Sequence, residues 1–481
     1  MITKSDLKQL SPVLWQIPRE FRRDMRVPAE VFANSKILEQ VFRDKSLEQL
    51  VNVSTLPGIV RAALLMPDAH EGYGFPIGGV AAMDMDEGVI SPGGIGYDIN
   101  CGVRLLVTKM VAEEIQDTLP DLARGLYRMV PSGVGASGRI RLDDQELDEV
   151  LKGGVDWATA HGYGTATDAG HIESHGQLPN ADPAAVSAHA KNRGRDQLGT
   201  MGAGNHFVEI GKVERIFDPE IARDFGLFSN QVTILIHCGS RGLGHQIATD
   251  YIRVMLGKLQ DYGIDLPDRE LACAPFQSPE GQRYFAAMTA AANFAWANRQ
   301  IITDEVRQVW REVLGESGGE ISILYDVAHN IAKIEEHVVG GIVKKLVVHR
   351  KGATRSFGPN HPELLPIHQK TGQPVLIPGS MGTASYVLAG TETAMKMSFG
   401  SSCHGAGRRM SRHQALREVS GKALKEELGA AGIFVETGSV RGLAEEAPFA
   451  YKDIHDVVGV VAEADLARKV AQLKPLAVIK G

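Results

Sequence analysis

Short runs of aliphatic and β-branched residues alternate with polar, glycine-rich segments through the centre of the chain. Runs of about four to eight such residues, bounded by turn residues, predict buried strands. The predicted strands are residues 103–108, 232–237, 321–326, 346–349 and 375–378. An alanine-rich segment at 279–314 and a short segment at 35–42 predict helices. We therefore expect an α+β fold, a single large domain of mixed β-sheets with surrounding helices.

The chain shows no internal repeat, low-complexity tract or linker, so we expect residues 1–481 to form one domain. The first 60 residues have mixed charge and no candidate chemistry, and they are the least diagnostic segment. Residues 110–195 are expected to form helices and loops. His171 and His175 in that region have the spacing of a helical ligand pair, but the glycines beside them favour loop histidines instead.

Composition indicates an ordinary globular protein of 481 residues, with 43% hydrophobic residues and a formal net charge of −7. No apolar run reaches the roughly 18 residues of a membrane helix, and no signal peptide is apparent, so we expect a cytoplasmic protein with no membrane partner. Four cysteines are too few for a disulfide framework in so long a chain. Because the chain is acidic overall, a polyanion would need a local basic surface. The candidate residues for that surface are Lys344, Lys345, Arg350, Lys351 and Arg355.

The stretch GGIGYDINCGVR at residues 93–104 presents Asp98 and Cys101 three positions apart. Glycine permits positive φ angles, so both side chains can turn toward one cation. A simple turn with a buried cysteine is the alternative interpretation. Asp68 and His70 lie in a second segment dense in glycine and proline, which predicts an ordered loop that carries function. The alternative there is a turn whose side chains satisfy its own backbone.

Three histidines, His206, His237 and His329, occupy similar positions at predicted strand ends or in glycine turns. Each alone could be an ordinary core or turn histidine. Together with one carboxylate and one thiolate, three neutral imidazoles suit two transition-metal ions that share a bridging ligand. Cys101 is the expected bridge because a bound metal holds a thiol deprotonated. These donors suit zinc as readily as manganese.

Two later segments indicate phosphate chemistry. Residues 377–385, IPGSMGTAS, offer backbone N–H groups and hydroxyls without bulky side chains, the composition of an anion-binding nest. His404 lies between small residues and near Arg408 and Arg409, and a neutral imidazole in such a position can attack phosphorus. A glycine-rich turn with a surface histidine is the alternative. Apolar residues close to the C-terminus predict a docked tail that holds Lys480 in place.

In order along the chain, these motifs resemble the RtcB family of RNA-splicing ligases from about residue 60 to the C-terminus. The matching motifs are Asp68-x-His70-x-Gly72-Tyr73-Gly74, Gly96-Tyr97-Asp98-Ile99-Asn100-Cys101-Gly102, Gly204-Asn205-His206-Phe207-x-Glu209, His237-x-Gly239-Ser240-Arg241-Gly242, His329-Asn330, Ser402-Cys403-His404-Gly405-Ala406-Gly407-Arg408 and Lys480-Gly481. The resemblance implies an RtcB-like fold and a GTP-dependent ligase that joins RNA 2′,3′-cyclic phosphate or 3′-phosphate ends to 5′-hydroxyl ends, in tRNA splicing or RNA repair. It also implies two Mn²⁺ ions per site, GTP, RNA partners such as tRNA halves or broken ends, and room for an accessory activating protein.

The resemblance further implies roles for individual residues. One Mn²⁺ would be held by Asp98, Cys101 and His206, and the other by Cys101, His237 and His329. His404 would become guanylylated, and Arg241 would lie on the RNA or phosphate side. The residues expected around the guanylate are Asn205, His206, Phe207, Val208, Glu209, His329, Asn330, Pro378, Gly379, Ser380, Met381, Ser385, His404, Gly405, Ala406, Gly407, Tyr451 and Lys480.

Two other function classes stay open from the residues alone. A dinuclear metal-dependent phosphodiesterase would use the same ligands with water as the final acceptor, but it leaves His404 and the predicted nest without a role. A metal-stabilised RNA-binding protein would have no joining activity, and the acidic net charge argues against it. The sequence has no Lys-x-Asp-Gly motif, so a lysine nucleophile of the kind found in other nucleotidyl-transferring ligases has no candidate.

Overall fold

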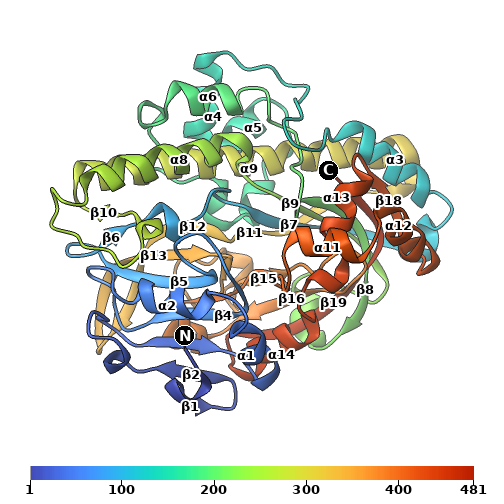
Figure 1. The fold of residues 1–481 in the computed structure, drawn as a ribbon. Helices are drawn as coiled ribbons and strands as arrows, with labels where there is room; N and C mark the ends of the chain where they lie inside the picture. Colours follow the sequence, from blue (N-terminus) through green and yellow to red (C-terminus); the bar gives the residue numbers. More distant parts are fainter. Residues whose placement is uncertain (1) are drawn as a thin grey trace.

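Two large β-sheets form the centre of the protein, which a computed structural model describes for residues 2–481 (Figure 1). The first sheet has seven strands in the order β1 (Lys8–Ser11), β2 (Leu14–Ile17), β3 (Ala29–Phe32), β4 (Ala63–His70), β5 (Ile77–Asp84), β13 (Ile342–Lys351) and β12 (Asn330–Val339). The second follows the order β11 (Ser322–Ala328), β7 (Gly102–Val111), β9 (Gln231–Cys238), β8 (Phe207–Ile216), β19 (Ala467–Lys480), β16 (Ser385–Gly390) and β15 (Pro374–Ile377), with β18 (Phe434–Thr437) parallel to β19. Two small sheets pair β6 (Val89–Ile90) with β10 (Ala274–Pro275) and β14 (Ala353–Arg355) with β17 (Ser401–Cys403). The predicted α+β class with mixed sheets is confirmed, whereas the single-domain organisation stays a prediction.

Helices surround these sheets, and the two longest, α8 (Arg241–Lys258) and α9 (Pro279–Leu314), pack against each other along one side of the molecule (Figure 1). The remaining helices are α1 (Ser35–Val41), α2 (Ser46–Val53), α3 (Leu119–Met129), α4 (Asp144–Gly153), α5 (Val155–Ala160), α6 (Ala188–Gly194), α7 (Pro219–Asp224), α10 (Glu392–Ser398), α11 (Arg412–Glu418), α12 (Gly421–Ala430), α13 (Val440–Glu445) and α14 (Ile454–Glu463). Within residues 2–481, no helix combines the length and the apolar character needed to cross a bilayer.

The sequence of helix α9 explains where the helix begins, where it ends and why its central part is buried. The Ser278 hydroxyl accepts a hydrogen bond from the backbone N–H of Gly281, and Pro279 occupies the first helical position. Gly315 ends the helix with a φ of 61°. Most of the central residues are buried alanines and aromatics, which let neighbouring helices and strands approach closely on several sides. The helix predicted at 279–314 is therefore confirmed.

Strand register brings the predicted metal ligands to one end of the second sheet. Gly102 of β7 lies opposite Cys238 of β9 on one side and Ala328 of β11 on the other. Phe207 of β8 lies opposite His237 of β9. Residues at or next to these positions share one sheet end because paired strands keep a fixed register. Those residues are Cys101, His206, His237 and His329.

The predicted strands all occur, as parts of β7, β9, β11, β13 and β15, although residues 321 and 378 fall just outside β11 and β15, and the short helix at 35–42 is α1. Five strands of eight or more residues were missed, namely β4, β5, β8, β12 and β19, because charged residues, glycine or proline interrupt their apolar runs. Asp68 and His70 lie in strand β4 and not in a loop, which corrects the prediction for that segment. His171 and His175 fall in short 3-10 turns at Asp168–His171 and Glu173–Gly176, as expected for loop histidines.

The predicted basic surface is wrong for three of its five residues. The Arg350, Lys351 and Arg355 side chains are buried, with exposed fractions of 0%, 3% and 2%. Arg350 forms a bidentate ion pair with Glu335, at 2.6 and 2.8 Å. Arg350 and Lys351 are neighbours in β13, so they point to opposite faces of the sheet, and both faces are covered over the second half of this strand. Arg355 is buried in the short strand β14. Their charges therefore serve internal ion pairs and carbonyl contacts, and they cannot meet a polyanion.

Candidate active site

Two groups of potential metal ligands share the thiol of Cys101 at the end of the second sheet. Its Sγ lies 3.3 Å from Nε2 of His206 and 3.3 Å from Nε2 of His237. On one side, His206 Nε2 lies 2.8 Å from Oδ2 of Asp98, and on the other, His237 Nε2 lies 3.1 Å from Nε2 of His329. Within each group, the donor atoms all lie within 4.8 Å of one another. The five side chains predicted as ligands thus converge on two adjacent points.

The loop that carries Asp98 and Cys101 is held by backbone contacts to neighbouring segments. The N–H of Asn100 donates to the carbonyl of Asn330 at 2.7 Å, and the N–H of His329 donates to the carbonyl of Cys101 at 2.9 Å. Asn100 itself has a φ of 50°, a left-handed conformation that asparagine tolerates better than most residues. These contacts fix the loop against the start of β12, so the two ligand groups are tied to each other through the main chain.

The electrostatics of the cluster suit cations. Burial lowers the pKa of both His237 and His329 well below the ordinary imidazole value, so both rings are neutral at pH 7. Burial, joined by the nearby Asp98 carboxylate, raises the pKa of the Cys101 thiol to about 12 without a metal. Two Nε2 atoms 3.1 Å apart cannot both direct N–H groups at each other, but their lone pairs can face one cation. The donor set therefore fits two divalent ions bridged by Cys101, and its chemistry suits Mn²⁺ or Zn²⁺.

His404 follows strand β17 and lies next to the ligand cluster. Its ring centroid is 5.1 Å from that of His329. Oδ2 of Asp68 accepts a hydrogen bond from Nδ1 of His404 at 2.5 Å and from its backbone N–H at 3.0 Å. Because Nδ1 is engaged, Nε2 is the ring nitrogen free to react. The sequence placed Asp68 in a functional segment but gave it no role. Its partner His404 lies 336 positions away, so no local pattern links the two residues.

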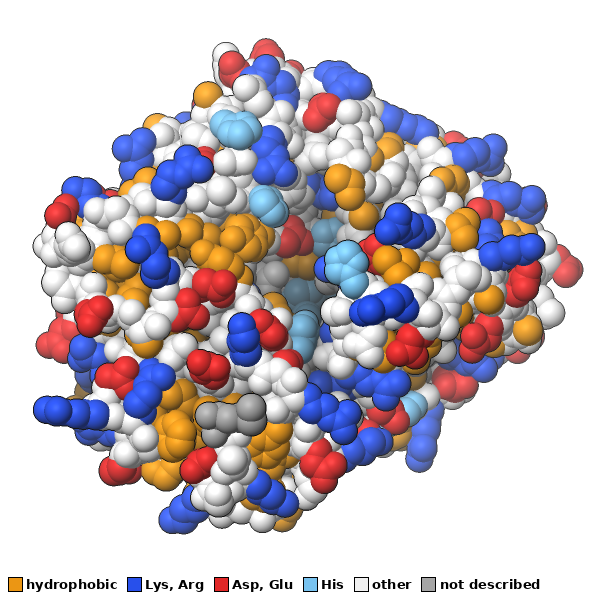
Figure 2. All heavy atoms as spheres, in the orientation of Figure 1, with side chains coloured by type: hydrophobic (Ala, Val, Ile, Leu, Met, Phe, Trp, Pro, Cys, Tyr) orange, Lys and Arg blue, Asp and Glu red, His pale blue; other side chains and the backbone are white. Residues whose placement is uncertain are grey.

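A cavity of about 820 Å³ opens above these histidines. Figure 2 shows a hollow near the centre of the viewed face, with histidine side chains within it. Many residues predicted to surround a guanylate line this cavity. They are Asn205, Phe207, His329, Asn330, Pro378, Gly379, Ser380, Met381, His404, Gly405, Ala406, Gly407, Tyr451 and Lys480. A cavity of this size and polarity can take a nucleotide next to the two ligand groups.

Some predicted residues support the cavity from behind its wall. Ser385 is buried, and its hydroxyl accepts a hydrogen bond from the N–H of Gly379 at 3.0 Å, which shapes the predicted nest. Val208 and Glu209 are buried in β8, and burial raises the pKa of Glu209 to about 8. Arg241 begins α8 and donates from Nε to the Thr200 hydroxyl at 3.0 Å.

The C-terminal strand brings Lys480 into the cavity wall. Lys480 pairs with Phe207 in the β19–β8 register, and its Nζ lies 5.6 Å from the centroid of the Phe207 ring. Its side chain is buried, and burial lowers its pKa to about 8. The predicted docking of the tail is confirmed. Nearby, the buried Glu446 carboxylate accepts hydrogen bonds from the Tyr451 hydroxyl and from Arg412 Nε. Glu446 has no glycine frame or motif, so no sequence signal pointed to it.

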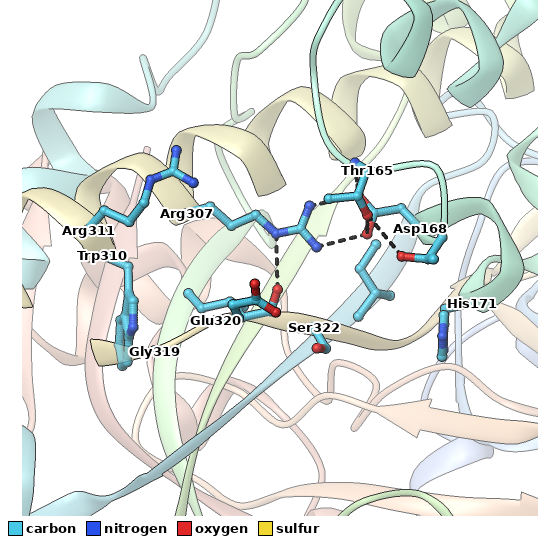
Figure 3. Close-up of a pocket in the computed structure, with 12 residues that line it drawn as sticks. Thr165, Asp168, His171, Arg307, Trp310, Arg311, Gly319, Glu320 and Ser322 are labelled. Atoms are coloured by element: carbon cyan, nitrogen blue, oxygen red, sulfur yellow. Dashed lines mark hydrogen bonds and ion pairs between the residues drawn. The ribbon is translucent and has the colours of Figure 1, made fainter. Parts of the chain in front are cut away.

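A second, smaller cavity of about 330 Å³ lies away from the ligand groups, between α9 and the start of β11 (Figure 3). Figure 3 shows Arg307 reaching from α9 toward Asp168, and the two nitrogens of its guanidinium lie 2.7 and 2.8 Å from the carboxylate oxygens. Nε of Arg307 also donates to the carbonyl of Ile321 at 3.1 Å. Because these buried charges pair with each other, we interpret Arg307 and Asp168 as a structural ion pair in the wall of the cavity and not as a ligand site.

A histidine oriented by a carboxylate lies in a nucleotide-sized cavity, beside two groups of potential metal ligands that share one thiol. This arrangement is that of an enzyme active site. A sequence model of the family described as tRNA-splicing ligase RtcB matches residues 49–481. The chain is 54% identical to the tRNA-splicing ligase RtcB of Thermococcus kodakarensis, over 99% of each chain. It is 52% identical to the RNA-splicing ligase RtcB of Mycobacterium tuberculosis, over 90% of this chain and all of that protein. The chain therefore belongs to the RtcB family, and the resemblance seen in the motifs is confirmed.

Proposed function

We propose that this chain is a GTP-dependent RNA ligase that joins a 2′,3′-cyclic phosphate or 3′-phosphate end to a 5′-hydroxyl end through guanylylated His404. One observation carries the proposal, which is the position of His404. Nδ1 of His404 donates a hydrogen bond to Oδ2 of Asp68 at 2.5 Å, and the His404 ring lies beside His329 of the metal-ligand cluster. Membership of the RtcB family supports the ligase class and RNA as the substrate. A phosphodiesterase would need neither a histidine so placed nor a nucleotide cavity around it.

In the first step, the lone pair on Nε2 of His404 attacks the α-phosphorus of GTP. A P–N bond forms, the P–O bond to pyrophosphate breaks, and pyrophosphate leaves. The ring becomes positively charged as the bond forms, and the Asp68 carboxylate on Nδ1 stabilises that charge. Residues of the nest and Lys480 line the cavity, and their backbone N–H groups and ammonium would meet phosphate oxygens there.

In the second step, an oxygen of the RNA 3′-phosphate attacks the GMP phosphorus, the P–N bond breaks and His404 becomes neutral again. In the third, the 5′-hydroxyl attacks the activated 3′-phosphorus, loses its proton and expels GMP. A cyclic phosphate end must first be opened by water. Mn²⁺ ions held by the two ligand groups around Cys101 would neutralise phosphate charge and acidify a bound water or hydroxyl.

Individual residues have proposed positions in this scheme. Asn205, Asn330, Tyr451 and the nest at residues 378–381 surround the guanylate, since all lie in the cavity wall. Arg241 lies next to the Asp98 side of the cluster and would meet the RNA phosphate there. The physiological RNA, an accessory protein and a cytoplasmic location stay predictions.

Labelled GTP tests the proposal directly. The wild-type chain with Mn²⁺ and α-labelled GTP should form a covalent protein–GMP adduct, and His404→Ala should form none. His413→Ala is the matched control, because His413 is an exposed histidine in α11 nearby and should keep the adduct.

The wild type should then join RNA with a 2′,3′-cyclic phosphate end to RNA with a 5′-hydroxyl end. Phosphate release from RNA without any adduct would establish a hydrolase instead. RNA binding with neither reaction would establish a metal-stabilised binding protein.

A further inference from the structure

Arg299 lies in the middle of helix α9 and has no exposed surface. Its guanidinium donates five hydrogen bonds, one for each N–H group that it carries. Nε and one terminal nitrogen bind the two carboxylate oxygens of Asp326 in β11, both at 2.8 Å. The other three bonds reach the Asp98 loop and the end of β9. The proposed chemistry gives this buried cation no role.

The segments that Arg299 binds carry one of the two groups of potential metal ligands. This group, the second ligand group, consists of Cys101, His237 and His329. One terminal nitrogen of Arg299 donates to the backbone carbonyls of Asn100 and Cys238, both at 2.8 Å. Asn100 directly precedes Cys101, and Cys238 directly follows His237. A single guanidinium therefore fixes the main chain beside two of the three ligands.

Asp326 connects Arg299 to the third ligand. It lies in β11 three positions before His329, and its strand is paired with β7 up to Ala328. Because a paired strand keeps a fixed register, fixing Asp326 also fixes the point at which the strand ends and His329 begins. Arg299 thus binds every chain segment that supplies the second ligand group. None of its five bonds reaches β8, the strand that follows His206.

Two residues of the Asp98 loop that supply no metal ligand are fitted to this arginine. A Cβ atom on Gly102 would lie 2.9 Å from a terminal nitrogen of Arg299 and 2.4 Å from the carbonyl oxygen of Val327, so only glycine fits there. The Asn100 side-chain oxygen accepts a hydrogen bond from Arg299 at 3.1 Å, and its Nδ2 donates to the Ala292 carbonyl of α9 at 2.7 Å. The loop is therefore built around α9 as well as around the ligand cluster.

We infer that Arg299 is a positioning residue, which holds the second ligand group at the separation that one divalent cation requires. The inference rests on the part of the proposed function that assigns a metal ion to this group. Lysine cannot replace the arginine, because a compact ammonium with three donors cannot span the loop, β9 and β11 together. Partners that orient metal ligands typically contribute about 10- to 100-fold in metal affinity.

The test titrates the metal-free full chain with Co²⁺, which binds nitrogen and sulfur donors and absorbs light by charge transfer from a bound thiolate. His329→Ala removes a ligand of the second group alone, so it identifies which step of the wild-type titration belongs to that group. In Arg299→Lys, the Kd of this step should rise at least about tenfold. The Kd of the other step should rise less, because His206 and Asp98 keep their own supports.

Arg104→Lys is the matched control. Arg104 is also fully buried and binds Oδ2 of Asp326 at 2.8 Å, but its other hydrogen bonds go to the Gln300 and Thr303 side chains of α9. Both variants break an ion pair with the same carboxylate, so both should lower the Tm. In Arg104→Lys the Kd of both Co²⁺ steps should stay within about twofold of the wild type.

Asn100→Gly decides the test if Arg299→Lys does not fold. Glycine adopts the φ of 50° at this position, so the substitution removes only the side-chain bonds to Arg299 and Ala292. The Kd of the second-group step should rise by about threefold or more. An unchanged Kd in this variant would overturn the inference.

Two other results would also overturn it. One is a folded Arg299→Lys variant that binds Co²⁺ like the wild type. The other is an equal loss in Arg104→Lys, because the effect would then follow from breaking the Asp326 ion pair alone. A wild-type chain that binds no Co²⁺ would overturn the inference together with the metal assignment. A wild type that binds two Co²⁺ ions but forms no GMP adduct with Mn²⁺ and GTP would refute the proposed ligase and leave the role of Arg299 standing.

Discussion

Replacing Asp68 with asparagine tests whether this carboxylate orients the nucleophile and stabilises its charge. The Asp68 side chain has no exposed surface. Its Oδ2 accepts three hydrogen bonds, from His404 Nδ1 at 2.5 Å, His404 N at 3.0 Å and Gly405 N at 3.3 Å. Asparagine keeps nearly the same shape but replaces a charged oxygen with a neutral amide. The substitution therefore removes the charge while leaving the volume of the site unchanged.

The expected magnitude follows from the change in that hydrogen bond. A hydrogen bond to a charged group contributes roughly 1.5–3 kcal/mol, against about 1 kcal/mol for a neutral pair. The His404 ring becomes positive only as the P–N bond forms, so the lost attraction acts mainly on the transition state. The difference between the two, about 0.5–2 kcal/mol, predicts that adduct formation slows by roughly 2- to 30-fold. GTP affinity should change much less, because Asp68 lies behind the histidine ring.

The assay follows the single-turnover rate of adduct formation at saturating α-labelled GTP. Asp44→Asn is the matched control, because Asp44 is another carboxylate that lines the cavity but binds the N–H and hydroxyl of Ser46 instead of His404. Its rate should stay within about twofold of the wild type. A folded Asp68→Asn variant that reacts at the wild-type rate would refute the reasoning, as would a defect that higher GTP concentration fully restores.

Three further predictions concern the metal, the tail and the core. Cys101→Ser should lose most bound Mn²⁺ by elemental analysis, because a serine hydroxyl stays protonated at neutral pH, and two retained equivalents would exclude the thiol as the bridge. Lys480→Ala should form adduct at least about tenfold more slowly at low GTP, since a buried ammonium is lost from the cavity wall, and normal rates there would contradict its role. Burial lowers the pKa of His349 to about 4, so the unfolded chain binds an extra proton between pH 6.5 and 4 and stability falls as pH drops through that range. Between pH 7 and 5, the free energy of unfolding should therefore fall by about 2 kcal/mol less in His349→Gln than in the wild type, as measured by urea unfolding. An equal fall in both proteins would contradict the lowered pKa of His349.

The sequence by itself determined the local elements. An alanine-rich segment identified α9, and β-branched runs identified the cores of β7, β9, β11, β13 and β15. Glycine-framed motifs identified the family, and with it the side chains that converge in the cavity. Such signals are readable because they depend on neighbours within a few residues, where backbone angles and side-chain periodicity leave a direct pattern.

Only the tertiary structure decided which distant groups meet. Asp68 binds His404 across 336 positions, and Tyr97 stacks on His245 across two separate segments. Arg350 looked like part of a basic surface, yet it is buried in an ion pair with Glu335. These contacts depend on strand register and on how two sheets and their helices pack. No short window of sequence encodes them, because a residue's partner is set by the path of the whole chain and not by its neighbours.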